Sequence, residues 1–328
     1  MIKKKINILN TVFYILIILG TLLLLINPKI VIDYIKNAVN LCFNILIPSI
    51  FPLLVFSSLF IETGLANDIG KLFNKIIKPI FNLNGSCAIA IILGIIAGYP
   101  IGAKIALDLY NNGNCNKSEA ERILAFCNNC SPSFIIGGIG VAIFGSVKIG
   151  ALLYFSQIVA SIIVGIAFGH LWKDNLNNNS YSNIIFKRKS IVNSLVISVK
   201  SSAINMAYIC GFVCFFSVII GLVNGYMIFD NISVFLSNFL PISRVYIKQL
   251  LVGFLELANG VNASTTIPSA IQLFILAIVI GWSGLSVHFQ VFAILSNSCL
   301  NKRAYIIGKT LQGFLSAFIT LIFLYIFN

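Results

Sequence analysis

The chain of 328 residues is 59% hydrophobic and only 9% charged, and its mean hydropathy is +0.99. About a quarter of the residues of a soluble domain are charged, so this composition excludes a soluble domain and predicts an integral membrane protein. The formal net charge of +13 does not indicate nucleic-acid binding, because the basic residues are scattered beside apolar runs and form no stripe with interleaved aromatic residues.

Eight cysteines fall mostly within apolar segments, where cysteine behaves as a small hydrophobic residue. We therefore expect no disulfide framework. Cys127 and Cys130 have the spacing of a zinc half-site or a redox motif, but no second pair with a matching His or Cys follows. We expect neither a metal nor a cofactor.

The N-terminal segment is a basic start followed by one long apolar run. Residues 1–5 are basic, and residues 6–26 are apolar up to Asn27 and Pro28. This run is longer than the core of a signal peptide, and no small-x-small cleavage site follows it. We therefore expect a first transmembrane helix within residues 1–30, with the N-terminus in the cytoplasm.

A kinked span and a surface helix come next. Residues 38–60 form an apolar run in which Pro48 and Pro52 predict a kink. Residues 67–79 place their apolar side chains on one helical face, which is typical of an amphipathic helix on the membrane surface. The positive-inside rule places this helix in the cytoplasm because it carries Lys71, Lys75 and Lys78.

The next apolar run, residues 88–109, is interrupted at its centre by Gly98, Tyr99, Pro100 and Gly102. Proline and glycine break a helix and free backbone carbonyl and amide groups, which hydrocarbon cannot satisfy. Such a break persists where it is buried in protein or lines a wet cavity, and Lys104 adds a charge that is costly at membrane depth. We therefore predict that this stretch belongs to a binding site.

Residues 86–110 could form one complete span or a re-entrant hairpin that turns back at residues 98–100. If this segment and the next two all crossed, the basic loop 187–189 would lie outside, against the positive-inside bias. A hairpin with both ends in the cytoplasm puts that loop, Lys117 and Arg122 all inside. We predict the hairpin.

Residues 118–144 form a second interrupted span, whose first helix starts with a capping box at residues 118–121. The interruption contains two amides and two hydroxyls at membrane depth: Asn128, Asn129, Ser131 and Ser133. Backbone amides at the start of the second half-helix form the positive end of a helix dipole, which suits an anion. The apolar run 149–172 then returns the chain to a cytoplasmic loop at residues 173–190.

The second half repeats this order of features. It contains a long span, an interfacial segment, an interrupted hairpin, a broken span and an intact span: residues 191–223, 228–240, 245–263, 270–295 and 304–327. Glu256, Asn259 and Gly260 interrupt the hairpin, and residues 282–288 interrupt the broken span.

Counting crossings makes the second half enter the membrane from the opposite side. We predict an all-α fold: one membrane domain over residues 1–328, a polytopic helical bundle with broken helices, two re-entrant hairpins and inverted structural repeats at 31–172 and 191–328. Inverted repeats with broken helices in corresponding positions indicate a secondary transporter whose site lies at the midplane between the halves.

Five short motifs, in this order, resemble the sporulation integral membrane protein YlbJ family. They are Pro48-Ser-Ile-Phe-Pro52, Gly98-Tyr-Pro-Ile-Gly-Ala-Lys104, Asn128-Asn-Cys-Ser-Pro-Ser-Phe134, Gly253-Phe-Leu-Glu256 with Asn259-Gly260, and Gly284-Leu-Ser-Val-His-Phe-Gln290. The resemblance spans nearly the whole chain. It implies nucleoside-recognition gate domains, distantly similar to concentrative nucleoside transporters. It further implies transport of dipicolinic acid from the mother cell across the outer forespore membrane, late in the sporulation of an endospore-forming bacterium.

We expect the substrate to bind where the interrupted segments meet. The predicted substrate-binding residues are Gly98, Tyr99, Pro100, Gly102, Lys104, Asn128, Asn129, Ser131, Ser133, Ser283, Gly284, Ser286, His288 and Gln290. For a small aromatic dianion, half-helix amides, Lys104 and hydroxyls would meet the carboxylates, and Tyr99 or Phe134 would lie against the ring. The neutral polar side chains could instead join helices within the lipid.

Three titratable positions have two interpretations each. The ammonium of Lys104 suits a carboxylate, or it snorkels to water. Glu256, with Asn259, could bind a proton or sodium ion that couples to transport, or it could only neutralise a lysine. His288 could relay a proton or contact the substrate, or pack beside aromatic residues.

No enzyme motif is present: the sequence has no His-Glu-x-x-His, no Gly-x-Ser-x-Gly and no complete dinucleotide fingerprint. We therefore predict a transporter in the lipid bilayer of the cell or outer forespore membrane, with dipicolinate or a nucleoside-like solute as its substrate. The competing class is a non-transporting structural or assembly membrane protein of the spore envelope. No nucleic-acid partner is expected, and a homo-oligomer is compatible with the sequence.

Overall fold

The computed structural model describes residues 8–172, 190–264 and 268–327, which contain helices and no β-strand. The predicted basic start and nearly all of the predicted loop 173–190, including its basic residues, lie outside the described residues. The structure confirms the predicted fold class of a polytopic helical membrane protein.

The first half begins with α1 (Ile8–Ile26). A long rod follows, formed by α2 (Pro28–Leu41), a π-helical turn (Cys42–Leu46) and α3 (Ile47–Glu62), and then comes the surface helix α4 (Leu65–Phe81). A 3₁₀ turn (Gly85–Cys87) leads into α5 (Ala88–Ile96) and α6 (Ile101–Asn111). Helix α7 (Lys117–Phe126), a π-helix (Ser133–Ile143) and α8 (Val147–Leu171) complete this half.

The second half has the same order of parts. The long helix α9 (Ile191–Gly225) precedes α10 (Ile228–Ser237), and α11 (Arg244–Leu255) is followed by α12 (Leu257–Asn262). Helices α13 (Ala270–Trp282) and α14 (Gly284–Ile294) are interrupted at Ser283, and α15 (Arg303–Phe327) is continuous.

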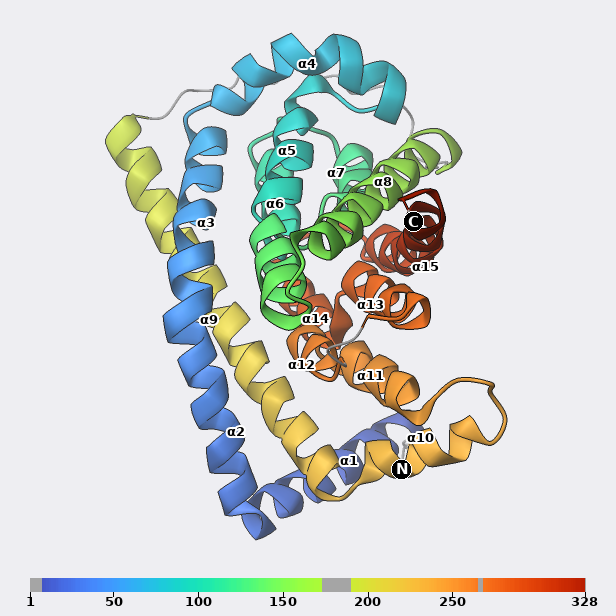
Figure 1. The fold of residues 1–328 in the computed structure, drawn as a ribbon. Coiled ribbons are helices and arrows are strands. Elements are labelled where there is room, and N and C mark those ends of the chain that lie inside the picture. The colour runs from blue at the N-terminus through green and yellow to red at the C-terminus, as the bar shows by residue number, and fades with distance from the viewer. Residues whose placement is uncertain (1–7, 173–189, 265–267, 328) are drawn as a thin grey trace.

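Hydrogen bonds between distant segments define two ends of the bundle, which we name the α4 side and the α10 side. On the α4 side, Ser86 Oγ donates to the carbonyl of Asn114 at 2.6 Å, and the amide of Asn301 donates to Glu121 Oε1 at 2.8 Å. On the α10 side, Asn27 Nδ2 donates to the hydroxyl of Tyr226 at 2.9 Å. In Figure 1 the α4 side is at the top and the α10 side at the bottom.

In both predicted hairpins the chain turns back on itself, and the two arms are joined on one side of the bundle. The bond between Ser86 and Asn114 joins the two ends of the α5–α6 segment on the α4 side. In the second half, Gln249 Nε2 donates to Ser264 Oγ at 2.8 Å, which joins the α11 and α12 arms on the α10 side. Residues 86–110 thus form a hairpin, the arrangement that charge counting predicts.

The two halves run in opposite directions. The α2–α3 rod climbs from the α10 side to the α4 side, and α9 descends beside it, with Ser194 Oγ 3.4 Å from the carbonyl of Glu62 (Figure 1). The hairpin of the first half enters from the α4 side and that of the second half from the α10 side. This arrangement agrees with the predicted inverted repeat.

By length and composition, α8, α9, α13 with α14, and α15 can each cross a membrane, and up to six spans result if two bent helix pairs are included. One of these pairs is α1 with α2, whose axes differ by 95°. The apolar side chains of α1 are largely uncovered by the rest of the chain, as in Leu25 (73% exposed).

The predicted capping box is displaced by two residues. Asn116 caps α7 by accepting from the amide of Glu119 at 2.8 Å, and Glu119 accepts from the amide of Asn116 at 2.9 Å. Asparagine is as good an N-cap as serine, so the earlier residue takes the position.

Two glycines let the first hairpin close over the unwound chain after α7. A Cβ atom on either Gly94 of α5 or Gly102 of α6 would collide with the carbonyl oxygen of Cys127. The two arms of the hairpin therefore hold this carbonyl between them, and any larger side chain would force them apart.

We expect Gly102→Ala to lower stability by about 1–3 kcal/mol, because the added methyl group must displace backbone atoms. Thermal unfolding of the detergent-purified protein would measure the change. Gly137→Ala is the matched control, since a Cβ there meets nothing within 4 Å. Equal unfolding midpoints for the two variants would show that the hairpin does not close on Cys127 as described.

Candidate functional site

The interruptions of the first half lie against each other. Gly98, at φ +85°, occupies the left-handed region at the tip of the first hairpin. A Cβ on this glycine would lie 3.0 Å from Cβ of Ser131, in the unwound segment between α7 and the π-helix. Gly98 is therefore required both by its backbone angle and by this close approach.

The second half repeats this contact with different residues. Ser283 and Gly284 both have positive φ, at 79° and 82°, where α13 gives way to α14. A Cβ on Gly284 would lie 3.1 Å from Cα of Glu256, at the tip of the second hairpin. Each hairpin tip thus rests on the break of the broken span in its own half.

The two pairs of breaks meet at Tyr99. Its side chain rises from the tip of the first hairpin, and its hydroxyl lies next to the side chains of Cys130 from the first half and Ser283 from the second. The hydroxyl is buried, and neither contact has the distance and angle of a good hydrogen bond. The predicted meeting of the interrupted segments is therefore present, and Tyr99 lies at its centre.

Lys309 of α15 is the residue that the sequence analysis missed. It is fully buried, and its Nζ donates to the carbonyl of Asn128 and to Oε1 of Gln312, each at 2.9 Å. The same Nζ lies 5.8 Å from the centre of the Tyr99 ring. Among the described residues, no carboxylate forms a salt bridge with Lys309.

A glycine brings Lys309 to this position. A Cβ on Gly308 would collide with the carbonyl of Ala125, so α15 packs against the last turn of α7 with backbone in contact. The next residue then reaches the unwound chain that follows α7. The sequence signal was Lys309 and Gln312, three positions apart on one helical face of an otherwise apolar span.

A hydrogen-bonded network supports the lysine. Gln312 Nε2 donates to Oδ1 of Asn129, and Asn129 Nδ2 donates to the carbonyl of Phe126 at 2.9 Å and to Ser161 Oγ at 3.2 Å. Ser161 Oγ itself donates to the carbonyl of Phe126 at 2.7 Å. Asn129 and Gln312 therefore hold the unwound segment and α15 together.

Beside this network lie buried polar atoms without partners. Within the described part of the chain, six such atoms belong to four neighbouring residues: the hydroxyl of Tyr99, Nε2 of His288, and both side-chain polar atoms of Asn128 and of Gln157. Nδ1 of His288 lies 2.9 Å from the hydroxyl of Tyr305, and this hydroxyl in turn lies near the side chain of Asn128. Because an unpaired buried polar group is costly, such a concentration points to a ligand.

Several predicted site residues have local partners. Lys104 forms a buried ion pair with Asp108 one turn along α6. The Glu256 carboxylate caps α12 by accepting from the amides of Ala258 and Asn259 at 3.1 and 2.8 Å, and from Asn259 Nδ2 at 2.8 Å. Lys104 is therefore not the lysine that contacts the unwound chain; Lys309 is.

The remaining predicted polar residues differ in burial. Ser286 and Gln290 are buried on α14 and bond to each other at 3.3 Å. Ser131 accepts from the amide of Phe134 at 3.3 Å, whereas Ser133 is exposed. Pro100 directly precedes α6. Asn128 and His288 are the predicted residues that join Tyr99 in the partner-free group.

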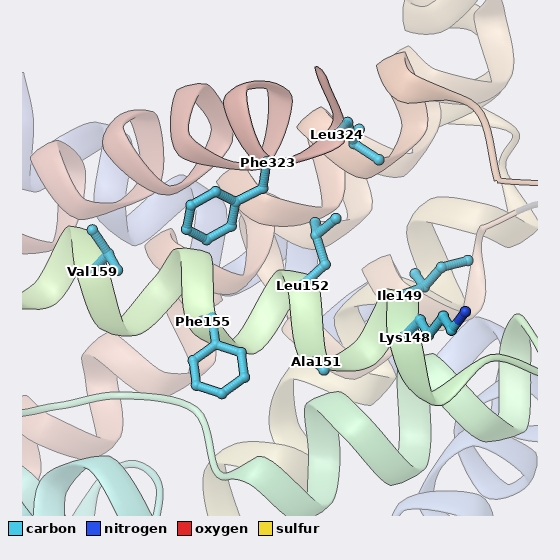
Figure 2. Close-up of a pocket in the computed structure, with 8 residues that line it drawn as sticks. All are labelled: Lys148, Ile149, Ala151, Leu152, Phe155, Val159, Phe323 and Leu324. Atoms are coloured by element: carbon cyan, nitrogen blue, oxygen red, sulfur yellow. The ribbon is translucent and has the colours of Figure 1, made fainter. Parts of the chain in front are cut away.

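A separate groove lies between α8 and α15 (Figure 2), with a volume of about 700 Å³. Its walls are apolar side chains such as Leu152, Phe155 and Phe323, and Lys148 stands at one end. None of the partner-free polar residues lines it. An apolar groove between membrane helices suits lipid or packing, so it is not the site for a polar solute.

Comparison with known proteins supports a membrane family. The family model described as Gate, nucleoside recognition, matches residues 43–169, which contain the first hairpin, the first broken span and most of α8. The sporulation integral membrane protein YlbJ of Bacillus subtilis (strain 168) is 26% identical over 336 residues, covering 96% of this chain and 82% of that protein. No solved structure matches.

Replacing two glutamines of the site should change the thermal unfolding midpoint in opposite directions. Gln157→Leu removes two buried polar atoms that have no partner, so it should raise the thermal unfolding midpoint while weakening substrate binding. Gln312→Leu breaks bonds to Lys309 and Asn129 and should lower the midpoint, by about 1–3 kcal/mol of stability. If both variants are destabilised alike, the partner-free atoms of Gln157 are structural and the ligand interpretation fails.

Proposed function

Since this chain is a multi-pass membrane homologue of YlbJ with a Gate domain, we propose that it is a non-enzymatic transporter of a small anionic solute during sporulation. The solute proposed is dipicolinate, carried across the outer forespore membrane. The support comes from the charge and the partner-free atoms of the site.

The single observation that carries the proposal is the fully buried Lys309. An ammonium at membrane depth is expensive unless a charge or several oxygen atoms compensate for it. Two oxygen acceptors contact Nζ, the Tyr99 ring lies 5.8 Å from it, and the side chain of Asn128, whose carbonyl is one of the acceptors, has no partner of its own. A carboxylate bound beside Nζ would neutralise the ammonium, and the side-chain amides of Asn128 and Gln157 are donors that it could use.

An aromatic dicarboxylate fits the remaining chemistry. The ring of Tyr99 offers an aromatic face within the site, and its hydroxyl and the amide groups offer donors for carboxylate oxygens. His288 Nε2 offers one further polar contact. These groups come from both halves, so the solute would bind between the repeats.

Each hairpin closes the site toward one side of the bundle, and its movement would open the site to that side. The first hairpin separates the site from the α4 side, and the second separates Ser283 from the α10 side. If one hairpin leaves its break while the other stays closed, the site opens to one side at a time, as alternating access requires.

The proposed orientation places the α4 side in the cytoplasm of the mother cell. That side carries most of the described basic residues outside the spans: Lys71, Lys75, Lys78, Lys117, Arg122, Lys302 and Arg303. The positive-inside rule favours this orientation. The α10 side would then face the intermembrane space, and the N-terminus would be cytoplasmic if α1 crosses the membrane.

A nucleoside is the second candidate solute, favoured by the description of the Gate model. The free amides of Asn128 and Gln157 could bind the edge of a base. A neutral nucleoside would leave Lys309 without a countercharge, which is why the anion is proposed first. Glu256, with Asn259, stays the proposed site for a coupling proton in either scheme.

The test is uptake by proteoliposomes that contain the purified full chain. We expect uptake of radiolabelled dipicolinate, with little uptake of uridine. Lys309→Met should reduce dipicolinate affinity about 10- to 100-fold, the loss of one charge-assisted contact. Lys75→Gln, at an exposed lysine of α4, is the matched control and should transport as the wild type does.

Uptake of uridine with no uptake of dipicolinate would replace the anion by a nucleoside. If neither solute moves under any ion gradient, the transport proposal loses to a structural or assembly role in the spore envelope.

A further inference from the structure

The partners of Lys309 are the partners of a bound metal cation. Nζ contacts a main-chain carbonyl oxygen, that of Asn128, and an amide oxygen, that of Gln312, both at 2.9 Å. The face of the Tyr99 ring lies on a further side at 5.8 Å. Carbonyl and amide oxygens are ligands that alkali cations accept, and aromatic faces attract cations.

The contact between Lys309 and Asn128 lies just after the C-terminal end of a helix, where transporters commonly bind cations. Asn128 follows the last turn of α7, where the unpaired carbonyls form the negative end of the helix dipole. In transporters built from inverted repeats, unwound carbonyls and half-helix C-terminal ends coordinate the coupling ion. In this protein the side chain of Lys309, from α15, supplies a positive charge at that position.

We propose that the ammonium of Lys309 is a tethered cation, which takes the place of a coupling metal ion. Substrate binding then needs neither sodium nor another alkali ion. The statement about substrate binding rests on the proposed function. The statement that the ammonium occupies a cation position concerns the protein alone.

The second hairpin gives this proposal independent support. Its one carboxylate, Glu256, already accepts three hydrogen bonds from Ala258 and Asn259 as the cap of α12. A metal ion at Glu256 would have to compete with these donors. The position at α7 is therefore the better cation site of the two, and a lysine occupies it.

A matched pair of variants separates the tethered cation from an ordinary buried lysine. Lys309→Ala removes the ammonium and leaves space beside the carbonyl of Asn128, so a small cation can enter. Lys309→Met removes the charge but fills the space with an apolar chain. In choline chloride we expect both unfolding midpoints to fall by about 5 °C.

Replacing choline by sodium or potassium chloride at equal ionic strength should restore at least half of the loss in Lys309→Ala. It should leave Lys309→Met and the wild type unchanged. Wild-type binding of dipicolinate should likewise be equal in sodium and choline media. A folded Lys309→Ala protein that ignores alkali ions, or sodium-dependent stability or binding in the wild type, would overturn the tethered cation.

The thermal and binding experiments distinguish this proposal from the transport proposal. If the wild type binds no dipicolinate in any medium, the substrate is wrong, yet the thermal comparison still decides the role of Lys309. If Lys309→Ala does not fold in choline, purification in sodium or potassium chloride tests the same rescue, and the wild-type comparison decides the remainder.

Discussion

Unpaired backbone groups at membrane depth are the constraint on which the structure depends. A chain that unwinds inside hydrocarbon must find partners for its carbonyls and amides within the protein. In the first half Lys309 supplies a donor to the carbonyl of Asn128, while Gly94 and Gly102 pack closely against the carbonyl of Cys127. The broken span is therefore stable only together with the hairpin and α15, and the three elements form one unit.

The same constraint explains how a lysine can be fully buried. Its ammonium is compensated by two oxygen atoms that would themselves be unpaired or poorly paired without it. Gln312 links the ammonium to Asn129, which in turn bonds the end of α7 and Ser161 of α8. Loss of any member would leave another polar group unsatisfied, so the network fixes the relative position of α7, α8 and α15.

The sequence could predict whatever local rules or charge counting decide. The hairpin at residues 86–110 followed from the positive-inside bias, and the breaks at Gly98, Asn128 and Ser283 followed from their residue types. The role of Lys309 could not be predicted, because an apolar span with one lysine does not reveal which helix it faces. The Lys104–Asp108 ion pair has the i, i+4 spacing of a helical pair, so it could be predicted from the sequence.

The two halves share a layout but not a charge. The first break is contacted by the ammonium of Lys309, which comes from α15, whereas the tip of the second hairpin carries the carboxylate of Glu256, which the amides of α12 hold. An anion between the halves is therefore attracted to the first break and meets a committed carboxylate at the second hairpin. Since Tyr99 of the first hairpin lies beside that ammonium, a bound anion contacts the first hairpin more directly than the second. If the solute is the proposed anion, this asymmetry makes the hairpin on the α4 side the one whose closure responds to it.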